Sequence, residues 1–161
     1  MMSGPRFLFL ALVLVLLHLI FFQYLSSDKV FPDLFLVLVV FAALQWGPMA
    51  GALAGFICGL AQDSFSFTYF GLQALSKTVI GFTLGKIRQS FYSNNYLVLL
   101  IIVLAAKTIH DLLYFGVYFS GELGSFWHQI LIYTPLSAVY TCVLGVAIYF
   151  LINFKIRITS G

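Results

Sequence analysis

The sequence has little charge for its length. Asp, Glu, Lys and Arg make up 8% of its 161 residues, whereas they make up about 25% of an ordinary soluble domain. Hydrophobic residues make up 62%, and the mean hydropathy is +1.06. This composition excludes a soluble globular protein and predicts a membrane protein. Because one crossing needs about 20 mostly apolar residues, the length allows about five to seven crossings and leaves no room for a soluble domain.

Cysteines and catalytic motifs are equally scarce. The two cysteines, Cys58 and Cys142, lie inside apolar runs, which excludes a disulfide framework and a zinc-binding spacing. No HExxH, CxxC, nucleophile elbow or paired-carboxylate spacing occurs in the sequence, so we expect no enzyme, no metal site and no cofactor. The net charge of +3 is small and dispersed, which excludes a nucleic-acid-binding surface.

Apolar runs are what the sequence has in abundance, and we expect six of them to cross the membrane. The expected spans are about 6–26, 31–46, 48–62, 71–88, 95–119 and 128–153. The first run is longer than the usual signal-peptide core of about 7 to 15 residues, and no A-x-A site follows it, so we expect it to be retained. The predicted fold class is therefore all-α, with residues 1–161 forming a single integral membrane domain, a six-helix bundle.

The charged residues that flank the spans predict the orientation of the bundle. With six spans, both termini and the second and fourth loops share one side of the membrane. The basic residues on that side are Arg6, Lys86, Arg88, Lys155 and Arg157. The charged residues on the other side are Asp28, Lys29, Asp63 and Glu122. Because Lys and Arg are enriched in cytoplasmic loops, we expect both termini in the cytoplasm.

The stretch GPMAGALAGFICGLAQD, residues 47–63, has a glycine at every fourth position: Gly47, Gly51, Gly55 and Gly59. A step of four residues turns a helix by about 400°, so these glycines form one stripe. Small residues let helices approach closely in lipid, where burying apolar side chains gains little. The stripe either packs against helices of the same chain or receives a transmembrane helix of another protein, and Gly71 and Gly81 extend the pattern into the next span. In both cases we expect the third span to be the helix most enclosed by protein.

Ionisable residues inside the predicted spans form a second candidate site, because such residues are costly in lipid. They are Asp33, Asp63, Lys77, Lys107 and Asp111. One interpretation is internal neutralisation, in which Lys107 pairs with Asp111 while Lys77 pairs with Asp63 or extends towards the outer surface. A second is a polar cavity, open to the outside, that binds a small ligand or a partner. A third is a proton relay, which is disfavoured because the inner half of the predicted bundle has no carboxylate.

Two segments of the sequence resemble a known family. FPDLFLVLVVFAALQWGPMAGALAGFICGLAQDSFS, followed by FGLQALSKTVIGFTLGKI, is similar to the rod shape-determining protein family MreD. The resemblance is specific over residues 31–88 and extends to the rest of the chain only as hydrophobic segments. The positions that match the family pattern are Pro32, Asp33, Gly51, Gly55, Gly59, Asp63, Gly71 and Leu72.

The resemblance implies a non-catalytic component of the bacterial cell-elongation machinery in the cytoplasmic (inner) membrane. Such a scaffold binds the protein MreC and, through it, links the glycosyltransferase RodA and its penicillin-binding transpeptidase to MreB filaments. The family is also similar in fold to the six-helix S-components of vitamin transporters. An alternative function is therefore an S-component-like module that captures a small metabolite for uptake, in a pocket formed by Asp63, Lys77 and Asp111.

Overall fold

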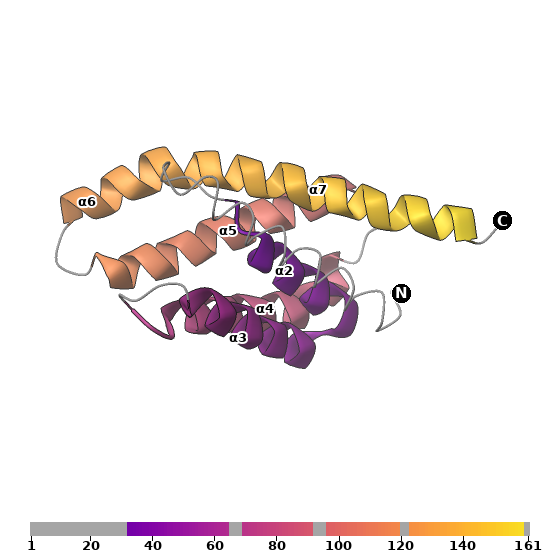
Figure 1. Cartoon of the computed structure of the whole chain (residues 1–161), viewed down its shortest axis with the longest axis horizontal. Helices are drawn as coiled ribbons and strands as arrows, with labels where there is room; N and C mark the ends of the chain where they lie inside the picture. Colours follow the sequence, from indigo (N-terminus) through magenta and orange to yellow (C-terminus); the bar gives the residue numbers. More distant parts are fainter. Residues whose placement is uncertain (1–31, 65–68, 92–95, 120–122, 160–161) are drawn as a thin grey trace.

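The structure is a computed structural model and describes residues 32–64, 69–91, 96–119 and 123–159 (Figure 1). The first predicted span, at about 6–26, lies outside the described residues. The flanking residues Arg6, Asp28, Lys29 and Glu122 and the side chains of Lys155 and Arg157 also lie outside them.

The described part of the chain is all-helical and contains no strand. Its elements are α2 (Leu34–Trp46), α3 (Pro48–Asp63), α4 (Leu72–Phe91), α5 (Tyr96–Tyr118), α6 (Leu123–His128), η1 (Gln129–Tyr133) and α7 (Thr134–Thr159). Where the sequence predicts one span at 128–153, the structure has α6, the π-helical turn η1 and α7 in direct succession. Two layers flank α2, with α3 and α4 on one side and α5 and α7 on the other (Figure 1).

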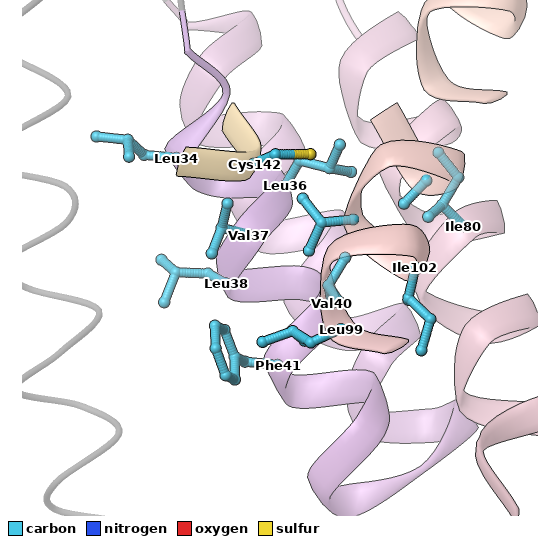
Figure 2. Packing of buried hydrophobic residues seen from close by; sticks show 12 residues of the cluster. Leu34, Leu36, Val37, Leu38, Val40, Phe41, Ile80, Leu99, Ile102 and Cys142 are labelled. Atoms are coloured by element: carbon cyan, nitrogen blue, oxygen red, sulfur yellow. The ribbon is translucent and has the colours of Figure 1, made fainter. Parts of the chain in front are cut away.

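Among the described helices, α2 is the one most enclosed by protein, which corrects the expectation for the third span. Every residue from Leu34 to Ala43 is buried, because α3, α4, α5 and α7 all pack against this helix. In Figure 2, Leu34 and Leu38 project to one side of α2, while Leu36 projects to the other, towards Ile80 and Ile102. In α3, by contrast, only the glycine face and Asp63 are buried, and the rest of the helix is half-buried or exposed.

The glycine stripe of α3 lies directly against the backbone of α4, in antiparallel register. A Cβ atom on Gly51 would collide with the carbonyl oxygen of Gly81, and one on Gly55 would collide with the carbonyl oxygen of Lys77. A Cβ on Gly59 would collide with the Cα of Ala74. Because the obstacle is backbone at each point, no side chain can rotate away to make room.

The hairpin between α2 and α3 forms the other end of this contact. Gly47 has a φ of 95°, which favours glycine, and Pro48 occupies the first turn of α3. The Arg88 guanidinium of α4 donates a hydrogen bond to the carbonyl oxygen of Gln45 at 3.1 Å and lies beside Gly47. The end of α4 is thereby fastened to the hairpin.

Two described stretches are long and apolar enough to cross a membrane, Leu97–Tyr118 and Phe126–Val146, and Leu34–Trp46 is a shorter apolar helix. α3 has only 16 residues, and α4 contains three basic residues. The crossings at 48–62 and 71–88 therefore remain predictions from the sequence.

Candidate functional site

A polar cavity of about 130 Å³ lies where α2 begins, α3 ends and α4 begins. Its wall includes Asp33, which directly precedes α2, Gln62 of α3 and Gln73 of α4. α5, η1 and α7 complete the wall with Lys107, His110, Asp111, Tyr114, Gln129, Tyr133, Thr134 and Ser137. Residues from five helical elements and from the segment just before α2 therefore meet around one small polar space.

Lys77 is the centre of the buried charges around this cavity. Its side chain is 0% exposed, and its Nζ atom lies 2.8 Å from Oδ2 of Asp33. The expected pairing of Lys77 with Asp63, or its extension towards the outer surface, is therefore wrong. The physical reason is that Lys77 lies on the face of α4 that packs against α2, which brings its ammonium to the start of α2.

Asp33 holds three helices together at this point. Its Oδ1 accepts a hydrogen bond from the Leu36 N–H at 2.9 Å, which caps the first turn of α2. Its own N–H donates to Oγ1 of Thr141 on α7 at 3.0 Å. With the Lys77 ion pair from α4, this one residue joins α2, α4 and α7.

His110 connects the Asp33–Lys77 pair to a second ion pair on α5. Lys107 and Asp111 form the expected pair one helical turn apart. The His110 ring places Nδ1 3.1 Å from Oδ1 of Asp111 and Nε2 3.1 Å from Nζ of Lys77. In a neutral His110 protonated on Nδ1, Nδ1 donates to the carboxylate and Nε2 accepts from the ammonium. Nε2 also lies 2.9 Å from Oε1 of Gln73, which accepts from Lys77, so no single neutral tautomer satisfies all three contacts of the ring. Two ammonium groups then balance two carboxylates within one connected network.

Asp63 is buried at the end of α3 and caps the next helix. Its carboxylate accepts hydrogen bonds from the N–H groups of Gly71, Gln73 and Ala74 at 3.0, 3.1 and 3.0 Å. These groups begin α4 and have no partner within the helix. Gly71 has a φ of 95°, and nothing lies within 4 Å of where its Cβ would be. Its requirement for glycine is therefore conformational, unlike that of the glycines that pack between α3 and α4.

We expect Asp63→Ala to destabilise the start of α4, because it leaves three N–H groups without their acceptor. The cost should be about 1–2 kcal/mol, at the upper end of measured N-cap losses. Thermal unfolding in detergent would measure the loss, and hydrogen exchange should accelerate at the amides of Gly71, Gln73 and Ala74. Asp63→Asn keeps one acceptor oxygen, so its unfolding midpoint should lie between those of the wild-type protein and Asp63→Ala. Unchanged exchange at these amides in Asp63→Ala would contradict the capping role.

Two oxygen atoms at the cavity wall have no hydrogen-bond partner among the described residues: Oε1 of Gln62 and Oγ1 of Thr134. Thr134 is only 5% exposed. Such atoms bind water or a polar group that enters the cavity. Within the described ranges, no three His, Cys, Asp or Glu side chains gather in a way that could hold a metal ion.

Comparison with protein families identifies the chain. The family described as rod shape-determining protein MreD matches residues 1–157. The chain belongs to the MreD family. Membership places it among the membrane proteins of the rod-shape machinery, which act in shape determination. A search of curated proteins and a search of solved structures returned no match.

Several residues of this MreD family member take part in the site without a signal in the sequence. Gln73 accepts a hydrogen bond from Lys77 at 2.8 Å, and Thr141 accepts from Asp33, yet a single Gln or Thr in an apolar run predicts neither contact. Asp63 lies eight residues before Gly71 in the sequence, so its capping of α4 depends on how α3 and α4 are placed and has no local sequence signal. His110 shares a helix face with Lys107 and Asp111, but its link to Lys77 depends on how α4 and α5 pack.

Proposed function

We propose that the chain is a non-catalytic scaffold of the rod-shape machinery that binds MreC. Through MreC it would link RodA and its penicillin-binding transpeptidase to MreB filaments. The observation that carries this proposal is the match of the MreD family to residues 1–157. We further propose that the chain crosses the bacterial inner membrane six times, with both termini in the cytoplasm.

The geometry of the polar site supports a structural role. Lys77 contacts Asp33, and Lys107 contacts Asp111, so the charges compensate one another inside the protein. The described carboxylates Asp33, Asp63 and Asp111 belong to one region of the bundle, around the start of α4. A proton relay across the membrane would need such groups at several depths. Internal neutralisation therefore has more support than a relay.

The glycine stripe bears on where MreC would bind. Gly51, Gly55 and Gly59 are in contact with α4, so this stripe has no free surface for a partner helix. We propose that the transmembrane helix of MreC lies on another apolar face of the bundle. The cavity, with its unpaired Gln62 and Thr134 oxygens, would then orient the periplasmic part of MreC.

The alternative of metabolite uptake has less support from the size of the cavity. Pockets for small molecules usually enclose about 300–1,000 Å³, whereas this cavity encloses about 130 Å³. It therefore suits water or one polar side chain better than a vitamin-sized ligand.

Purification of the tagged chain from native membranes tests the proposal. We expect MreC to co-purify in stoichiometric amount, because a scaffold acts by holding its partner. Native mass spectrometry of the same sample would detect either bound MreC or a small-molecule adduct. A monodisperse, folded chain that carries a metabolite and no MreC would contradict the scaffold and favour uptake.

A further inference from the structure

The α3–α4 layer exposes a short apolar surface. α3 exposes Met49, Leu53, Phe56 and Ile57, and these four are the large apolar side chains that this helix leaves exposed. The helix has 16 residues, which corresponds to a length of about 24 Å. The hydrocarbon core of a typical bilayer is about 30 Å thick.

Both ends of α3 are fixed, so the helix cannot lengthen to match the bilayer. At its start, the backbone turns at Gly47, and Pro48 occupies the first turn. At its end, the Asp63 carboxylate is hydrogen-bonded to the first turn of α4. Any added turn at either end would remove one of these contacts.

The exposed face of α4 gives a second estimate of how long the apolar surface of the α3–α4 layer is. The exposed aromatic side chains of Tyr69 and Phe70 precede this helix, and Phe70 is 72% exposed. Towards the other end, Lys86 is exposed. The segment between these markers, residues 71–85, has a length of about 22 Å, and the large side chains that it exposes, Leu75, Val79 and Phe82, are apolar. Aromatic and basic side chains are the residues that mark membrane interfaces.

The opposite layer is longer. α5 has 23 residues, a length of about 35 Å, and its exposed apolar side chains extend from Leu97 to Val117. A helix that is too long for the bilayer can tilt, but tilting a short helix only increases its deficit. The two layers of one rigid bundle therefore require different thicknesses of bilayer.

We propose that the α3–α4 layer thins the bilayer beside it and recruits lipids with short acyl chains. This inference rests on the proposed membrane-spanning topology. The partner is the hydrocarbon of the bilayer itself, and the preference is confined to one side of the protein. In the cell, a locally thin patch would favour neighbouring proteins whose spans are equally short.

Site-directed fluorescence quenching by brominated lipids tests the proposal. The full chain would carry Trp46→Phe and Trp127→Phe, with one new reporter, either Val79→Trp on α4 or Ile109→Trp on α5. The two positions are a matched pair, because they are 47% and 50% exposed. Each protein would be reconstituted in mixed vesicles of dimyristoleoyl- and dierucoyl-phosphatidylcholine, with either lipid brominated at its double bonds. We expect the short-chain lipid to be enriched on the order of threefold at Val79→Trp and not at Ile109→Trp.

The outcomes separate this inference from the topology on which it rests. Equal quenching by the two lipids at Val79→Trp would overturn local thinning while leaving the membrane-spanning bundle intact. Absence of quenching by either lipid at both reporters would instead overturn the topology. Lys86→Leu, which lengthens the apolar stretch of α4, should reduce the short-chain preference, whereas Lys86→Arg should retain it. A preference that persists unchanged in Lys86→Leu would overturn the assignment of Lys86 as the boundary, and the inference with it.

Discussion

Gly55→Ala is expected to destabilise the protein, although the same change at an ordinary helix position stabilises. Alanine is about 1 kcal/mol better than glycine in a helix interior. At position 55, however, the new Cβ would collide with the carbonyl oxygen of Lys77. Because that oxygen belongs to the backbone of α4, the two helices must separate. Gly55→Leu enlarges the collision, and we expect it to cost about 3 kcal/mol or more and to abolish a stable fold.

Gly116→Ala is the matched control for this experiment. Gly116 also lies within a helix, but it is exposed, and nothing lies within 4 Å of where its Cβ would be. Thermal unfolding in detergent should therefore show opposite signs, with a lower midpoint for Gly55→Ala and a higher or equal one for Gly116→Ala. Two stabilised variants would show that α3 and α4 do not meet at Gly55.

Lys77→Met is expected to have the second large effect, because it leaves the buried Asp33 carboxylate without its counter-charge. Removing one partner of a buried ion pair costs about 3–5 kcal/mol. Lys77 is fully buried and also donates to Gln73, so further polar groups lose their partner. We expect a strongly lowered unfolding midpoint in detergent and loss of rod shape in cells that depend on the variant.

A double variant separates charge imbalance from lost packing. Asp33→Asn removes the negative charge but keeps an oxygen that can cap α2 at Leu36. Lys77→Met with Asp33→Asn should therefore recover a substantial part of the lost stability. Lys86→Met, at an exposed position, should change stability by less than about 0.5 kcal/mol. If Lys77→Met were as stable as Lys86→Met, the Asp33–Lys77 pair could not be present in the folded protein.

The sequence predicts local features of this protein better than contacts between helices. Pro48 and the glycine before it predict where α3 begins, and the four-residue spacing places Lys107 beside Asp111. The partner of Lys77 depends instead on how α2 and α4 pack against each other, and the spacing of residues in the sequence does not predict that packing. Both outcomes that the sequence suggests for this lysine, pairing with Asp63 or extension towards the outer surface, are therefore wrong.

The most enclosed helix was mispredicted for a related reason. α2 is apolar on every face, and in a soluble protein such a helix is a buried one. In a membrane protein, lipid and protein interior are both apolar, so the same pattern fits either surrounding. The glycines of α3 indicate one close contact, and that contact covers a single face of the helix.

The paired positions of α3 and α4 also restrict how this part of the gene can change length. Gly51 faces Gly81, Gly55 faces Lys77 and Gly59 faces Ala74, so each step along one helix is matched by a step along the other. Inserting one residue between Gly51 and Gly59 would rotate the following glycine by about 100° and place a bulky side chain against α4. Insertions and deletions in this hairpin should therefore be far rarer among natural variants than substitutions on its exposed face.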